Sequence, residues 1–193
     1  MNLRSTRRIT YSTPPSAADM EALNEIAAID AGDADAEGSA RRAALVASLG
    51  TVTQLRATVA TMAALQMYRF QSMRREIGGW VEAETGKTWA QAVDAPESFA
   101  LVRIALKWPV AIASLTKLET REIGIMEEDA ATPWAEIELP DAWRTPAGYL
   151  GEAPIELIDA LDAAALAVNP GLYGPAFAGS GDELKKSGGI SVE

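Results

Sequence analysis

Pairs of neighbouring carboxylates are the residues of this chain that could perform acid–base chemistry. Glu127/Glu128 and Glu136/Glu138 are two such pairs. Catalysis of this kind needs two carboxylates held across a cleft with their pKa values driven apart. Both pairs lie in charged, loop-like sequence, which predicts solvent exposure and ordinary titration. We therefore predict no catalytic residue among them.

Lys107, beside Trp108, is the one lysine in an apolar stretch. Burial can lower a lysine pKa enough for a reactive role, but the long side chain more readily extends its ammonium group to water. The chain has no His and no Cys, so Ser-His-Asp and Cys-His sites, thiolate metal sites and disulfides are excluded. The sequence thus predicts a protein that is not an enzyme and that holds no cofactor or metal ion.

Two short segments resemble ligand-binding loops but fail on spacing. Residues 32–38 alternate acids with small residues, yet they lack the glycine and the closing glutamate that a calcium loop needs. Residues 84–88 read Glu-Thr-Gly-Lys-Thr, but Val81 stands five residues before Gly86, where a phosphate loop needs glycine. Gly86 is better interpreted as the C-cap of a helix.

Charge is unevenly spread over a chain whose formal net charge is −10. Residues 1–15 and 41–75 carry arginines and no acid, whereas residues 119–162 are strongly acidic. The asymmetry is interpreted either as internal complementarity or as a surface for a charged protein partner. Nucleic acid is not expected, because the net charge repels phosphates.

The candidate partner-binding residues are arginines of the two acid-free segments, together with three aromatic residues. They are Arg4, Arg7, Arg8, Tyr11, Arg69, Arg74, Arg75, Trp134 and Trp143. The arm that carries the first four is β-prone and could add a strand to a partner. The two tryptophans could form a ligand surface, or they could be lids packed over a helical core.

Helical periodicity predicts an all-α fold: an irregular helical bundle of about four to six helices with a flexible N-terminal arm and C-terminal tail. Ser16, with Asp19 three residues on, predicts the N-cap of the first helix. The longest predicted helix, rich in arginine, runs from Ser39 to about Glu84.

Later segments complete the predicted bundle. Residues 96–119 are the most apolar of the chain and are predicted to form a helix at the centre of the core, kinked or split at Pro109. Pro154 is predicted to open a last helix, in which Ile155, Ile158 and further apolar residues through Val168 form the buried stripe.

These elements define the expected organisation. Residues 1–15 are an extended arm, residues 16–168 are a helical domain in which a subdivision near 86–95 stays open, and residues 169–193 are a flexible tail rich in Gly, Ser and Pro. The start has no apolar run behind its arginines, and no stretch approaches membrane-spanning length. We therefore expect a cytoplasmic protein, or one in a particle assembled there.

Three segments carry a resemblance to a known family. They are the apolar run Ala105-Leu106-Lys107-Trp108-Pro109, the run Trp143-Arg144-Thr145-Pro146-Ala147-Gly148-Tyr149-Leu150-Gly151 with the helix that follows it to Asn169-Pro170-Gly171, and a polar tail with Lys185-Lys186. Over residues 85–193 the chain resembles the tail assembly chaperones of long-tailed bacteriophages. In that family the codons of such a lysine pair can form an A-rich slippery site, at which a frameshift produces a longer form of the protein.

The resemblance implies a non-enzymatic phage assembly factor that binds a helical client, such as a tape measure protein. It brings no catalytic residues with it. The alternative is a structural subunit of a virion or other particle, with the arm and tail ordered by neighbouring subunits. Either hypothesis predicts protein partners, leaves homo-oligomerisation open and expects neither nucleic acid nor membrane as a partner.

Overall fold

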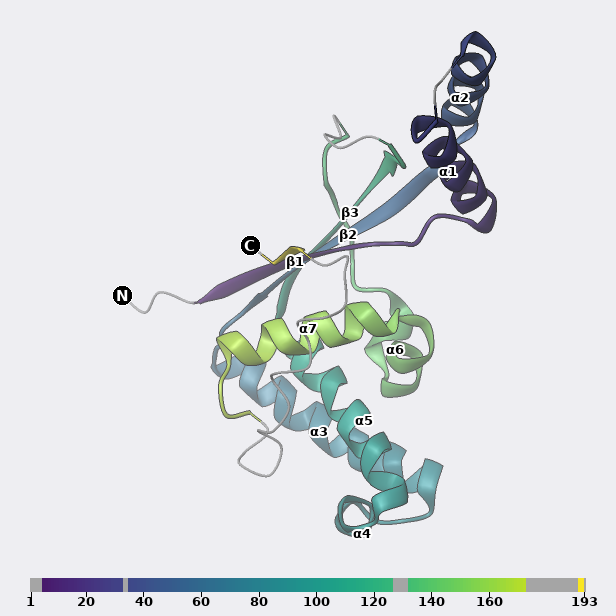
Figure 1. The fold of residues 1–193 in the computed structure, drawn as a ribbon. Coiled ribbons are helices and arrows are strands. Elements are labelled where there is room, and N and C mark those ends of the chain that lie inside the picture. The colour runs from purple at the N-terminus through teal and green to yellow at the C-terminus, as the bar shows by residue number, and fades with distance from the viewer. Residues whose placement is uncertain (1–4, 33–34, 127–131, 173–190, 193) are drawn as a thin grey trace. The chain divides into compact units, whose positions relative to one another are not determined.

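The computed structural model describes residues 5–32, 35–126, 132–172 and 191–192 of the chain. These residues form seven α-helices, one 3-10 helix and five strands (Figure 1), so the prediction of an all-α bundle is wrong. In chain order the elements are β1 (Thr6–Ser12), α1 (Ala17–Asp30), α2 (Ala36–Ser48), β2 (Thr51–Ala60), α3 (Ala64–Thr85), α4 (Trp89–Asp94), α5 (Pro96–Ser114), β3 (Leu115–Gly124), β4 (Ala135–Glu136), η1 (Asp141–Arg144), α6 (Pro146–Glu152), α7 (Ile155–Val168) and β5 (Ser191–Val192).

The strands form one sheet in the order β4-β3-β2-β1-β5. β5 pairs antiparallel with β1, so that Ile9 lies opposite Val192 and Thr10 lies opposite Ser191. Much of the predicted arm is therefore a strand of the chain's own sheet. Of the predicted flexible tail, residues 173–190 and 193 lie outside the described residues.

The chain divides into two compact units that interleave along the sequence. Unit 1 comprises Met1–Tyr11, Arg56–Leu118 and Glu136–Glu193, and unit 2 comprises Ser12–Leu55 and Glu119–Ala135. Both β2 and β3 run from one unit into the other. None of the helices described is both long and apolar enough to cross a membrane.

Unit 2 contains the helical hairpin of α1 and α2. The predicted cap of α1 is confirmed, because the Ser16 hydroxyl accepts a hydrogen bond from the backbone N–H of Asp19 at 3.1 Å. Arg41 of α2 forms an ion pair with Glu25 of α1. Arg42 of α2 forms a second ion pair, with Asp30 of α1, at 2.6 Å. Two arginines of the acid-free segment 41–75 are thus paired within the chain. Both acids come from α1 and lie outside the acidic segment 119–162, so these pairs balance the two arginines locally.

Asp19 provides a pH-dependent link in unit 2. The Ser16 hydroxyl, which lies 2.5 Å from its carboxylate, and the backbone N–H of Gly50 at 2.9 Å hold the pKa of Asp19 below its ordinary value of 3.8. Because the folded state lowers this pKa, the stabilisation is present above the ordinary pKa and is lost as the pH falls through the lowered one.

We expect the NMR titration midpoint of the Asp19 carboxyl to lie below 3.8 and to rise in Ser16→Ala, because the largest cause of the shift is removed. Asp30 is the control. The Arg42 guanidinium lowers its pKa without any part played by Ser16, so its midpoint should not change. An unchanged Asp19 midpoint in Ser16→Ala would contradict this account.

α5 is the centre of unit 1. Eleven of its nineteen residues are buried, which confirms the prediction that the core centre lies in the segment beginning at residue 96. The indole N–H of Trp108 donates to the carbonyl oxygen of Trp143 at 2.9 Å. Helices α3, α4, α6 and α7 pack against α5 (Figure 1). The helix continues unbroken across Pro109, so the predicted split is wrong.

The predicted helix from Ser39 to Glu84 is wrong, because the strand β2 interrupts it. Apolar residues of this strand fall at steps of three and four, which also suits a helix. Five of its ten residues, however, are the β-branched Thr or Val, and these pack best on a pleated surface. Ala57 and Val59, two residues apart, are both fully buried, as the alternation of a strand requires. Likewise the helix predicted to end at 119 stops at Ser114, and β3 follows.

Candidate functional site

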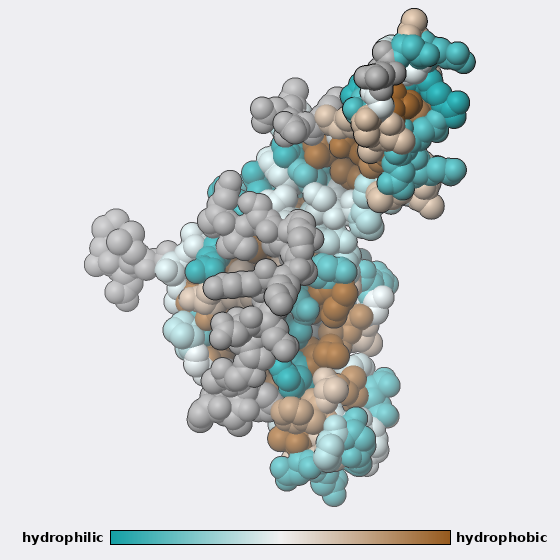
Figure 2. All heavy atoms as spheres, viewed as in Figure 1, coloured by the Kyte–Doolittle hydropathy of each residue, from teal (hydrophilic) through white to brown (hydrophobic). Residues whose placement is uncertain are grey.

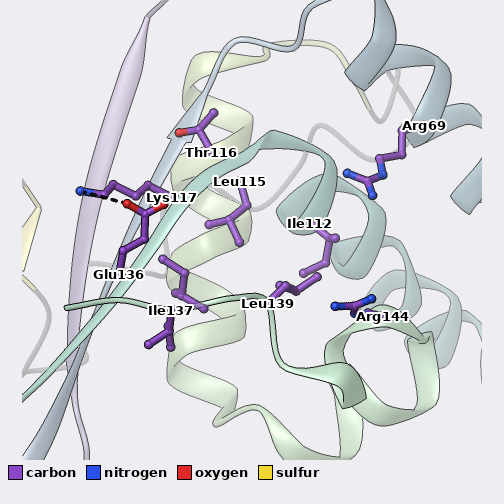
Figure 3. Close-up of a pocket in the computed structure, with 10 residues that line it drawn as sticks. Arg69, Ile112, Leu115, Thr116, Lys117, Glu136, Ile137, Leu139 and Arg144 are labelled. Atoms are coloured by element: carbon purple, nitrogen blue, oxygen red, sulfur yellow. Dashed lines mark ion pairs between the residues drawn. The ribbon is translucent and has the colours of Figure 1, made fainter.

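A cavity of about 340 Å³ lies in unit 1 (Figure 3). Four stretches far apart in sequence surround it: α3, the end of α5 with the start of β3, the chain around and after β4, and η1. Its lining residues are Arg69, Ile112, Leu115, Thr116, Lys117, Leu118, Glu136, Ile137, Leu139 and Arg144. The volume is at the lower end of the range of small-ligand pockets, and it would hold one or two side chains of a partner.

Two arginines flank one end of this cavity. Arg69 comes from α3 and Arg144 from η1, and Figure 3 shows both side chains on the side of the cavity formed by those helices. Ile112 and Leu139 lie beside them and supply an apolar wall. At the opposite end Lys117 pairs with Glu136 at 3.7 Å, and the two side chains are 44% and 69% exposed. The cavity therefore combines a cationic end with an apolar wall.

The charge at the cationic end is only weakly compensated within the chain. Arg144 meets Asp141 at 3.2 Å, but the side chains are 58% and 94% exposed, and such surface pairs contribute little. Among the residues that the structure describes, Arg69 forms no ion pair. Guanidinium groups stay protonated at any physiological pH, so this end presents a permanent positive charge.

The outer face of α3 exposes two large apolar side chains next to the cavity. Leu65 is 78% exposed and Tyr68 is 72% exposed, more than any other large apolar residue described. Residues three and four apart on a helix lie side by side, so Leu65 is adjacent to both Tyr68 and Arg69. Figure 2 shows further apolar, brown surface among hydrophilic, teal atoms on the visible face of unit 1. We call Leu65, Tyr68 and Arg69 the α3 patch.

The arginines and the tyrosine predicted from sequence lie in different places. Arg4 lies outside the described residues, while Arg7 and Arg8 are exposed on β1. Tyr11 on the same strand is buried, and its burial, together with nearby Glu156, raises the pKa of its hydroxyl. On α3 the three predicted arginines are all exposed, but only Arg69 lines the cavity.

The two predicted tryptophans belong to different environments. Trp143 is 5% exposed, and its ring stands edge-on to Tyr149 with ring centroids 5.6 Å apart. This burial agrees with the interpretation of Trp143 as a lid packed over the helical core, not as part of a ligand surface. Trp134, in unit 2, is half-buried, and the guanidinium of Arg121 lies 4.4 Å from its ring centroid. Of the predicted partner-binding residues that the structure describes, Arg69 alone lines the cavity.

The residues considered for chemistry from the sequence do not converge. Glu127 and Glu128 lie outside the described residues. Glu136 pairs with Lys117, and Lys107 forms an ion pair with Asp159 of α7. The described part of the chain contains no group of three or more acidic residues that could hold a metal ion. The arrangement at the cavity can bind an anion and bury an apolar group.

Sequence reasoning missed most of the cavity and the exposed pair on α3. Ile112 and Leu115 fall in the segment predicted as the core centre. No local pattern marks Arg144 and Leu139, because they meet the other lining residues only in the folded chain. Leu65 and Tyr68 fall within the single long helix predicted from Ser39 to about Glu84. Comparisons with protein-family models, with curated protein sequences and with solved structures found no match to this chain.

Proposed function

We propose that this protein is a non-enzymatic phage assembly factor that binds a helical client protein, such as a tape measure protein, through the α3 patch. The observation that carries the proposal is the exposure of Leu65 and Tyr68 beside Arg69 on one helix face. The likeness of residues 85–193 to tail assembly chaperones supports the phage setting. The absence of His and Cys from the chain favours binding over catalysis.

The composition of the α3 patch suits protein recognition. Tyrosine and arginine are over-represented among the residues that dominate binding energy, and an amphipathic helix commonly lays its apolar face on such a surface. Burial of a leucine or aromatic side chain contributes about 1.5 to 3 kcal/mol. A client helix that covers Leu65 and Tyr68 would therefore gain substantial affinity from two residues.

Co-purification with a co-expressed tape measure protein tests the proposal. We expect the wild-type protein to retain this client and to raise its soluble yield. The double variant Leu65→Ser/Tyr68→Ser should retain at least about tenfold less, because two apolar contacts are lost.

Ile155→Ser is the matched control, since Ile155 is 52% exposed on α7 and lies outside the α3 patch. Its client retention should equal that of the wild type. Failure of the wild-type protein to retain the client, or equal losses in both variants, would contradict the proposal.

A structural subunit of a particle is the second candidate, and the edge of the sheet favours it. Among the residues that the structure describes, β5 pairs with Ile9 and Thr10 of the seven-residue β1, and an edge of this kind could accept a strand from a neighbour. Mass spectrometry of mature particles separates the two candidates. A subunit should be abundant there, whereas an assembly factor should be absent.

A further inference from the structure

The cavity beside the α3 patch combines positive charge with an apolar wall. The chain carries a net charge of −10, yet two arginines from separate elements flank one end of this cavity (Figure 3). An arginine fork matches the two oxygens of a carboxylate, and such charge-assisted hydrogen bonds are stronger than neutral ones.

We infer that this cavity receives the carboxylate of a glutamate or aspartate from the client helix, with an apolar neighbour of that residue against Ile112 and Leu139. The inference rests on the proposed function and names the chemistry of its client. A negatively charged side chain is the expected occupant, because the positive charge of Arg69 and Arg144 is only weakly compensated within the chain. A nucleic-acid backbone is disfavoured, because its many phosphates would extend beyond the two arginines over a chain whose net charge is −10.

The position of Arg69 links the cavity to the α3 patch. Arg69 follows Leu65 by one helical turn, so the two side chains lie on the same face of α3. A client helix that places apolar residues on Leu65 and Tyr68 would bring a residue about one turn away to Arg69. The expected client motif is therefore an amphipathic helix with an acidic residue next to its apolar stripe.

A pair of probe peptides tests the inference on the full chain. One is a short alanine–leucine helix with glutamates beside its leucine stripe, and the other has glutamine at the same positions. We expect fluorescence anisotropy to show the glutamate peptide binding about tenfold more tightly. This preference should shrink as the salt concentration rises. The Nε–Hε signals of Arg69 and Arg144 should shift on addition of the glutamate peptide.

The double variant Arg69→Gln/Arg144→Gln should abolish the preference for glutamate, and Arg75→Gln should preserve it. Arg75 is the matched control because it is exposed on the same helix but does not line the cavity. An equal affinity for the two peptides, no binding of the glutamate peptide at millimolar concentration, or a preference that survives in the double variant would overturn the inference.

The same assay distinguishes failure of this inference from failure of the proposed function. Loss of binding of both peptides in Leu65→Ser/Tyr68→Ser, with the glutamate preference unchanged in the arginine variant, would refute the cavity assignment and leave docking on α3 standing. Loss of the preference in the arginine variant, with no effect of Leu65→Ser/Tyr68→Ser on peptide or client, would support the cavity and refute the proposed docking face.

Discussion

Replacement of Gly148 by alanine is expected to lower the free energy of unfolding by about 2 to 3 kcal/mol, as overpacking of a fixed site does. A Cβ at Gly148 would lie 2.1 Å from the carbonyl oxygen of Ala142 and 2.8 Å from its carbonyl carbon. Both are backbone atoms, so no side-chain rotation can relieve the clash. The turn from η1 into α6 would have to open, although the Thr145 side chain caps α6 by accepting from the N–H of Gly148 at 3.2 Å.

Gly151→Ala is the matched control for Gly148→Ala. Both glycines lie in α6, but nothing lies within 4 Å of a Cβ at Gly151. Alanine there should leave stability unchanged or raise it by up to about 1 kcal/mol, because alanine favours helix and restricts the unfolded chain. Urea denaturation followed by circular dichroism measures both effects. Equal losses of stability in the two variants would show that the close approach to Ala142 is not the cause.

Local capping signals were predictable from the sequence because each depends on a few neighbouring residues. Ser16 caps α1 as predicted, and Gly86 ends α3 with a φ of 67°, the left-handed conformation that glycine adopts at low cost. The last helix also begins directly after Pro154 as predicted. Its predicted stripe is buried at Ile158, Leu161, Ala165 and Val168, whereas Ile155 is 52% exposed.

The sheet was not predictable by the same reasoning. The apolar residues of β2 satisfy a helical period and a strand period at once, and only the β-branched content of the segment separates the two. Pairing partners in a sheet come from distant segments: the Thr116 hydroxyl donates to the carbonyl oxygen of Thr58, for example, at 3.0 Å. Tertiary contacts of this kind override local propensity.

The candidate site was only partly predictable for a related reason. An acid-free segment marked Arg69 as a residue that could meet a partner. Arg144 and Leu139 reach the same cavity from a segment about 70 residues away in sequence. Because charge patterning reports composition along the chain, it cannot reveal which arginines share a cavity with an apolar wall.

Asn169 at the end of α7 is the second position at which we expect a large effect. Its side-chain amide donates to the carbonyl oxygens of Ala60 at 3.1 Å and of Ala165 at 3.0 Å, and its carbonyl oxygen accepts from the N–H of Met62 at 2.7 Å. Asn169 is 6% exposed, so water does not readily replace these bonds. One side chain therefore joins the end of α7 to the segment that leads from β2 into α3.

Asn169→Ala should lower the free energy of unfolding by about 2 to 4 kcal/mol, because it removes the donor to the carbonyl of the buried Ala60 and the acceptor for the N–H of Met62, and a buried polar group that loses its partner costs about 1 to 3 kcal/mol. Asn24→Ala is the matched control, since Asn24 is exposed on α1 and alanine favours helix there. Urea denaturation measures the change. Amide hydrogen exchange should also be faster at Met62 in Asn169→Ala. A loss of stability no larger than that of Asn24→Ala would mean that the hydrogen bonds to Ala60 and Met62 do not hold the end of α7 to the segment after β2.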